Sequence, residues 1–154
     1  MKNKLAVFAA AGMGILFCAS GASAISYNPL NWIKRPTASQ QLAANADQEK
    51  KLSVGLQAIL PPRTTLKDAC TTFKSLDDCV ASLHVSNNLQ IKFNCLKWRM
   101  TGVRPTGDVK SCDAPAKALS LDKAIRALKP DVNAKAEARN AERRAKEDIK
   151  DASS

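Results

Sequence analysis

Four cysteines and one histidine are the residues of this sequence with the widest choice of chemistry. Cys70, Cys79, Cys95 and Cys112 follow the spacing C-x8-C-x15-C-x16-C, and His84 lies between the second and third of them. These residue types can ligate zinc, and a free thiol beside a histidine base can act as a nucleophile. Zinc-binding sequences usually bring two ligands close together, as in C-x2-C, and this spacing has no such pair. The spacing therefore favours a third possibility, in which the cysteines form disulfides and His84 is a partly buried helix residue.

The N-terminus indicates the compartment in which these cysteines would act. Lys2 and Lys4 precede an uncharged apolar run over residues 5–19, and small residues follow at 22–24. This layout is typical of a secretory signal peptide, and the run is short for a membrane span of ~20 apolar residues. Cys18 follows Phe17 rather than a small residue, so we do not expect lipid attachment there. We predict that residues 1–24 are a signal peptide, that the exported protein begins at Ile25, and that no transmembrane segment follows.

Export to the periplasm or the extracellular space explains the cysteine count. The mature chain would keep four cysteines, and an even number in an oxidising compartment predicts disulfides. Four cysteines allow three pairings, and the sequence leaves all three open. We favour Cys70–Cys79, which would join two adjacent short helices, and Cys95–Cys112, which would hold a long loop against a helix. No metal and no cofactor are expected.

The elements that would position these residues are helices. Thr37 and Gln40 fit a capping box, and Pro61 and Pro62 end the first predicted helix. Later helix starts show serine caps, and Gly102 suits a left-handed C-cap. The predicted helices cover residues 37–60, 64–73, 75 to about 86, 93–101 and 120–130, with a loop over 103–117. Residues 92–98 could alternatively form a strand, because polar and apolar residues partly alternate there.

These elements predict a small all-α domain of about five helices over residues 37–130, stapled by disulfides. Residues 25–36 contain two prolines and read as an extended N-terminal arm. Residues 131–154 are rich in alanine and in paired charges. Because alanine buries little apolar area, we expect this segment to be a solvated helix or a disordered tail outside the core.

The charge of the chain is strongly basic. It holds 24 Lys and Arg against 14 Asp and Glu, a formal net charge of +10. The excess lies before residue 131, and Lys92, Lys97, Arg99 and Arg104 form a run with no acid among them. Such a run could bind an anionic polymer or a membrane surface, with Trp98 adding an apolar contact. The alternative is a charge that only maintains solubility.

The motifs of common enzyme classes are missing from the sequence. It has no G-x-S-x-G elbow, no H-E-x-x-H and no phosphate-binding glycine loop, and it offers a single histidine. We therefore predict no catalytic residues and no enzyme. The expected function is a structural or interaction module of the cell envelope or secreted space. The alternatives are a weak binder of anionic polymers or membrane surfaces and, less favoured, a small hydrolase.

Two stretches of the sequence resemble a known group of proteins. "FKSLDDCVASLHVSNNLQIKFNCLKWRMTG", residues 73–102, followed by "ALSLDKAIRALKP", residues 118–130, is similar to a family of small exported bacterial proteins of uncharacterised function. The shared pattern is VSNNL…F..LK..MTG…SL..AI..LKP. The resemblance implies export and a helical packing unit. It implies no activity, cofactor or site residue.

Overall fold

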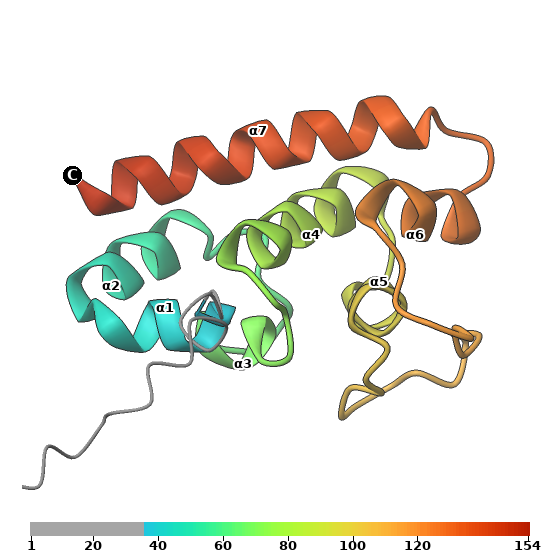
Figure 1. Ribbon diagram of the computed structural model, residues 1–154, viewed down its shortest axis with the longest axis horizontal. Helices are drawn as coiled ribbons and strands as arrows, with labels where there is room; N and C mark the ends of the chain where they lie inside the picture. Colours follow the sequence, from blue (N-terminus) through green and yellow to red (C-terminus); the bar gives the residue numbers. More distant parts are fainter. Residues whose placement is uncertain (1–35) are drawn as a thin grey trace, which may run out of the picture. The chain divides into compact units, whose positions relative to one another are not determined.

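A computed structural model describes residues 36–154, and the predicted signal peptide and most of the predicted arm lie outside this range. The described part contains seven α-helices and no strand (Figure 1). The helices are α1 (Ala38–Ala44), α2 (Ala46–Gly55), α3 (Leu66–Cys70), α4 (Leu76–Leu89), α5 (Phe93–Thr101), α6 (Leu121–Leu128) and α7 (Ala134–Ser153). The predicted all-α class is confirmed, and residues 93–98 belong to a helix rather than to the alternative strand. None of these helices combines the length and apolar character that a membrane span needs.

The first predicted helix is two helices, which is one reason why the expected five become seven. The capping box that begins α1 is present: Thr37 N donates to Gln40 Oε1 at 2.9 Å, and Gln40 N donates to Thr37 Oγ1 at 3.4 Å. The break falls at Asn45, whose backbone is extended and whose Oδ1 accepts from Gln48 N at 3.0 Å. Asparagine satisfies an exposed N–H of the next helix better than it continues a helix.

The end of α4 also differs from the expectation. The residues "SNN" at 86–88 remain helical, and the helix continues to Leu89, which is buried. Gln90 then adopts a left-handed conformation with φ 54°, which ends the helix. Asn87 and Asn88, in this last turn, are exposed. Gly102 forms the expected left-handed cap of α5, with φ 72°.

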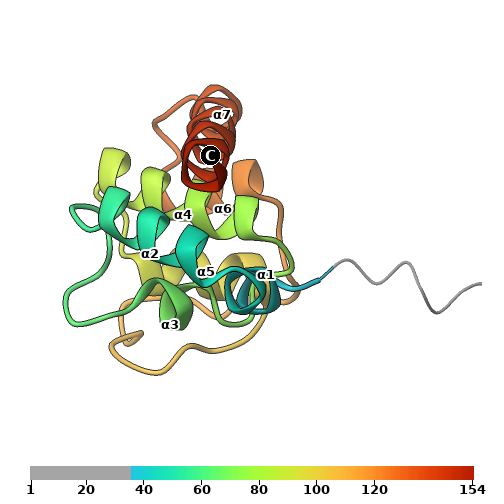
Figure 2. The same ribbon diagram turned by 90° about the vertical axis from the view of Figure 1, so that its left-hand side faces the viewer.

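Helix α4 is the centre of the core. Eight of its 14 residues are buried, including Cys79, Val80, Leu83 and Val85, and even Ser82 is inaccessible to solvent. Helices α1, α3, α5, α6 and α7 all pack against it. In Figure 2, which looks along α7, α4 lies between α7 and the layer that contains α3 and α5. A helix with so many buried residues needs neighbours over most of its surface, and its exposed residues, Asp78, Asn87 and Asn88, lie toward its ends.

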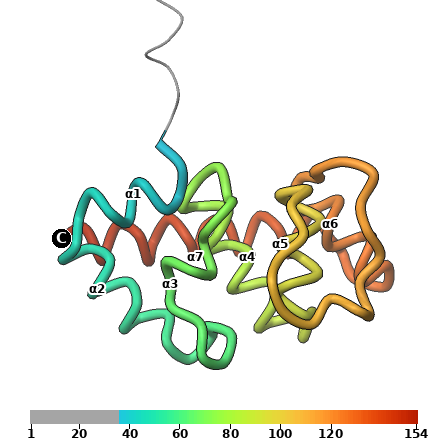
Figure 3. The backbone as a smooth tube through the Cα atoms, turned by 90° about the horizontal axis from the view of Figure 1, so that it is seen from below, coloured from blue at the N-terminus to red at the C-terminus, as the bar shows by residue number. Residues whose placement is uncertain are grey.

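Helix α7 corrects the expectation for residues 131–154. The segment is a 20-residue helix, and five of its alanines are buried in the same core as the leucines of α4: Ala134, Ala138, Ala141, Ala145 and Ala152. It lies along α4 and reaches α2 at one end and α6 at the other (Figures 1 and 3). Small side chains let two helix backbones approach closely, and α4 supplies the apolar volume. The expectation that this segment lies outside the core is therefore wrong, and the domain extends beyond residue 130.

Both favoured disulfides are present. Cys70 pairs with Cys79 and Cys95 pairs with Cys112, each with a Cα–Cα distance of 5.3 Å. The first joins α3 to α4 within the core, where both cysteines are inaccessible to solvent. The second joins α5 to the loop that precedes α6. The prediction of a small disulfide-stapled helical domain is confirmed in these respects.

Candidate functional site

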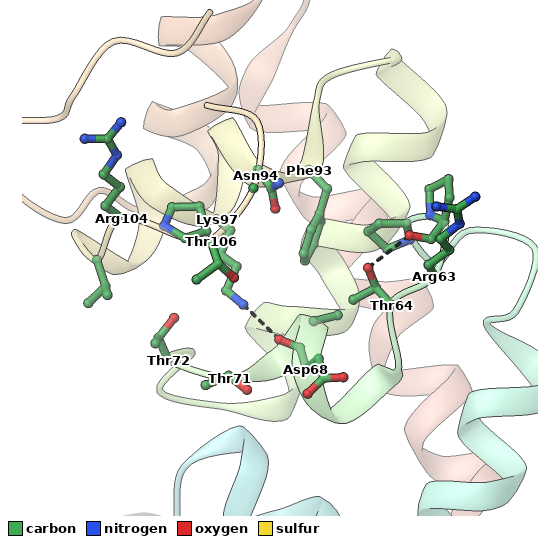
Figure 4. Close-up of a pocket in the computed structure, with 16 residues that line it drawn as sticks. Arg63, Thr64, Asp68, Thr71, Thr72, Phe93, Asn94, Lys97, Arg104 and Thr106 are labelled. Carbon is green, nitrogen blue, oxygen red and sulfur yellow. Dashed lines mark hydrogen bonds between the residues drawn. The ribbon is translucent and has the colours of Figure 1, made fainter. Parts of the chain in front are cut away.

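A groove of about 770 Å³, lined by both polar and apolar side chains, lies between α3, α5 and two loops. The first loop, residues 61–64, leads into α3, and the second, residues 103–107, follows α5. Figure 4 shows the lining residues, which come from these four segments and from residues 71–72 directly after α3. The volume falls within the ~300–1,000 Å³ that small-ligand sites occupy in proteins. The groove is therefore the candidate binding site of the described residues.

Lys97 lies at the base of this groove. The residue is 8% exposed, and its Nζ donates to the backbone carbonyl of Asp68 at 3.0 Å. The alkyl stem can pack along apolar side chains while the ammonium reaches the groove, as lysine stems commonly do. Burial lowers the pKa of the Lys97 ammonium below its ordinary value of 10.5, and the nearby Asp68 carboxylate opposes this shift. The groove thus holds a cation whose hydration is reduced by burial.

Two arginines flank the lysine. Arg63 follows Pro61 and Pro62 and adopts φ 58°, an uncommon conformation for a residue with a side chain. Arg104 stacks its guanidinium on Trp98, with Cζ 5.5 Å from the ring centroid. Figure 4 places the two arginines on opposite sides of the groove, with Lys97 between them. The site therefore has one buried cation at its base and an exposed cation on each side.

Short polar side chains make up much of the remaining lining. They are Thr64, Thr71, Thr72, Asn94 and Thr106. Thr71 Oγ1 donates to Lys67 O at 2.9 Å, and Thr64 Oγ1 donates to Pro62 O at 3.3 Å. A hydroxyl that donates in this way keeps its lone pairs as acceptors for a ligand. Asp68 has its carboxylate near the site, where Thr65 Oγ1 donates to Oδ2 at 2.6 Å.

The wall formed by residues 103–107 depends on α5 for its position. Leu119 N donates to Arg99 O at 2.8 Å, and the Cys95–Cys112 disulfide holds the loop near its middle. Gly107 has φ 112°, and a Cβ there would come within 3.2 Å of Asn94 Nδ2. A side chain at position 107 would therefore meet both backbone strain and a close contact. These features place the loop against the helix that carries Lys97.

The four basic candidates from the sequence do not share one exposed face. Lys97 is buried, and the Arg99 side chain is 13% exposed and reaches Asp113 at 3.7 Å. Lys92 is exposed, and its Nζ bonds Ser111 Oγ at 2.9 Å and Asp108 Oδ2 at 3.4 Å. Of the four, only Lys97 and Arg104 line the groove. The idea of one continuous basic surface made by these residues does not fit their positions.

His84 pairs with an acid of α7 and takes no part in the groove. Its Nε2 lies 2.6 Å from Asp148 Oδ2, and its side chain is 13% exposed. This agrees with the expectation of a partly buried helix residue. No cluster of three or more potential metal-ligating side chains occurs among residues 36–154.

Sequence reasoning missed two parts of the site, Arg63 and the Asp68 carbonyl that holds Lys97. The pair "PPR" at 61–63 marks a rigid loop with a charged end, which is a weak signal for a ligand contact. No local signal indicates that Lys97 points inward, because its position on α5 becomes buried only when α3 packs nearby.

Comparisons with known proteins gave no match to this chain. No protein-family model matches it, and no curated protein or solved structure matches it either. The resemblance described from residues 73–130 therefore stays a prediction.

Proposed function

We propose that the protein is an exported, non-catalytic interaction module of the cell envelope or the secreted space. The observation that carries this proposal is the groove with Lys97 at its base and further polar and charged side chains around it. A desolvated ammonium flanked by arginines and threonines offers several hydrogen-bond donors to a ligand. Recognition, rather than bond breaking, is the use that such an arrangement of donors supports best.

The environment of Lys97 supports binding over catalysis. Its Nζ donates to a backbone carbonyl, and the nearby Asp68 carboxylate accepts from Thr65. A nucleophilic lysine works beside a group that takes up its proton or supports its neutral form. Here burial, the larger influence, lowers the pKa of Lys97, and the nearby Asp68 carboxylate opposes this shift. The binding role is therefore proposed from the geometry, because the contact that Lys97 Nζ makes is with a backbone carbonyl, which cannot take up its proton.

The disulfides support export. Both bridges form across short sequence separations of 9 and 17 residues. Such bridges persist in oxidising compartments and are rare in the reducing cytosol. Together with the predicted signal peptide, they support a location in the periplasm or outside the cell.

Site-specific photo-crosslinking in the native host would test the interaction role. A Thr106→p-benzoylphenylalanine variant places the photoreactive group at the groove, and a Lys123→p-benzoylphenylalanine variant places it on the exposed side of α6. We expect a light-dependent adduct with an envelope or secreted component from position 106 alone. Equal adducts from both positions, or none from position 106, would contradict the proposal. Conversion of the captured component into a product by the purified protein would contradict its non-catalytic part.

A further inference from the structure

The groove's charges suggest the kind of ligand that it accepts. Arg63, Lys97 and Arg104 carry three positive charges, and Asp68 carries the only negative charge in the lining. The surplus is concentrated around a cavity rather than spread over a surface. A concave site lined by one sign of charge attracts a ligand of the opposite sign.

Lys97 is the strongest point of this attraction. An ammonium has three N–H donors, and the structure directs one of them to the Asp68 carbonyl at 3.0 Å. Its burial lowers the screening by water, so an entering anion would interact with it more strongly than with an exposed lysine. The anion would also compensate for the hydration that Lys97 has lost.

The neutral part of the lining indicates what carries the negative charge. Four threonine hydroxyls and the Asn94 amide provide both donors and acceptors. The lining also has apolar side chains, among them Pro61, Phe93 and Pro105, beside its three basic residues. An amphipathic helix would require a groove without these charges, and an extended peptide would usually add to a sheet edge, which residues 36–154 do not contain. A saccharide, whose hydroxyl groups donate and accept in turn, matches this lining better than a peptide does.

We propose that the groove between α3 and α5 binds an acidic saccharide, a sugar chain that bears carboxylate or phosphate groups. This inference rests on the proposed interaction role and names the ligand class for the same site. Lys97 binds an acidic group of the central sugar, and the threonines and Asn94 bind ring hydroxyls. Arg63 and Arg104 lie on opposite sides of the groove, and their guanidinium groups point outward in Figure 4. They therefore contact acidic groups of neighbouring sugars, so an oligosaccharide binds more tightly than its monosaccharide.

Calorimetric titration of the oxidised mature protein would test this inference. The probes are an oligogalacturonate, a phosphorylated sugar, and a neutral oligosaccharide of the same length as the oligogalacturonate. We expect binding by one or both acidic probes, no binding by the neutral one, and weaker binding as the salt concentration rises. The two acidic probes distinguish a carboxylate from a phosphate as the recognised group.

Matched variants would locate the binding. An Arg63→Gln/Arg104→Gln variant removes two exposed charges of the groove, and Arg126→Gln/Arg139→Gln removes two exposed charges elsewhere. Loss of charge-assisted hydrogen bonds should weaken binding about tenfold or more in the first variant, and the second should stay close to the unchanged protein. Lys97→Met should abolish binding while the circular dichroism spectrum stays helical. If Lys97→Met fails to fold, the arginine pair still decides the outcome, because its side chains are exposed.

Several results would overturn the inference. One is equal affinity for the neutral and the acidic probes, and another is an equal loss of affinity in the two arginine variants. A third, from a parallel titration with anionic vesicles, is binding to the vesicles alone with an affinity that the groove substitutions leave unchanged. A groove-specific photo-crosslink without binding of either acidic probe would reject the saccharide and leave the interaction role standing. If neither a groove-specific photo-crosslink nor binding of an acidic probe is found, both the interaction role and the saccharide ligand are rejected.

Discussion

Lys97 has an environment that penalises its charged form, and this has a consequence for stability. In the folded protein, burial lowers the pKa of Lys97 below its ordinary value of 10.5. The unfolded chain therefore holds the proton to a higher pH than the folded chain does. Between the two pKa values the unfolded state binds more protons, and the free energy of unfolding then rises with pH. The penalty is fully present below the pKa of the folded state and disappears above about pH 10.5.

The first prediction follows from this sign. The stability of the unchanged protein, relative to a Lys97→Met variant, should increase as pH rises from 7 toward 10.5. Urea unfolding at a series of pH values would measure the difference. For Lys123→Met, which alters an exposed lysine, the same difference should stay nearly constant. If the difference in the free energy of unfolding between the unchanged protein and Lys97→Met stays constant or decreases as pH rises, the Lys97 charge is not penalised by burial.

The His84–Asp148 contact joins two residues that are 64 positions apart in the chain. It links α4 to α7 at a place where the histidine side chain is 13% exposed. Replacing one member leaves the other without its partner in a partly buried setting. The contact should therefore contribute measurably to the attachment of α7.

We expect Asp148→Ala to lower the free energy of unfolding by about 1 kcal/mol, the typical effect of losing such a hydrogen bond. Asp151→Ala, on an exposed position of the same helix, makes the same change of charge and should have a smaller effect. Chemical denaturation of both variants would compare them. Equal effects would show that the charge, rather than the contact with His84, matters.

At the scale of elements, α7 has the largest consequence for stability. Ala145 is inaccessible to solvent where α7 packs in the core, while Asn140 on the same helix is exposed. We expect Ala145→Glu to destabilise the protein by about 3 kcal/mol or more, because it places a carboxylate in a closely packed contact. Asn140→Glu adds the same charge at the surface and should change stability by less than about 0.5 kcal/mol. Thermal unfolding would compare the melting temperatures of the two variants. Similar melting temperatures would indicate that residues 131–154 form a solvated tail outside the core.

The loop between α5 and α6 supplies one wall of the groove, and its disulfide should hold it there. A Cys95→Ser/Cys112→Ser variant should lose up to about 3 kcal/mol of stability, the chain-entropy estimate for a closed loop of this size. Limited proteolysis should then cut within residues 103–119 earlier than in the unchanged protein. The Cys70→Ser/Cys79→Ser variant should destabilise the core without this selective cleavage. Equal cleavage of the loop in both variants would show that the 95–112 bridge does not hold it.

At the scale of the whole molecule, the prediction concerns processing and oxidation. Expression of the full chain in a bacterium should yield an exported form that begins at Ile25 and carries two disulfides. Intact-mass analysis before and after reduction would show a gain of four hydrogens on reduction, and alkylation should occur only afterwards. An exported fraction that retains Met1, or native protein that alkylates without reduction, would contradict the predicted leader or the pairing.

The features that the sequence alone could determine are local ones. Thr37 with Gln40, and Gly102, marked the start of α1 and the end of α5, because capping depends on residues within a few positions of each other. The favoured disulfide partners are also near neighbours in the chain, at separations of 9 and 17. Local patterns gave the wrong result at Asn45. This residue caps a second helix, although the apolar pattern around it predicts one continuous helix.

Only the tertiary structure decided which polar residues are buried and which alanines are core. Lys97 is one of a run of basic residues in the sequence, and it becomes the base of a groove because α3 brings the Asp68 carbonyl to its amine. Ala141 and Ala145 are weakly apolar in isolation, and they enter the core because α4 fills the space above their small side chains. Burial is a property of the neighbours that a residue acquires, and those neighbours come from segments far away in the chain.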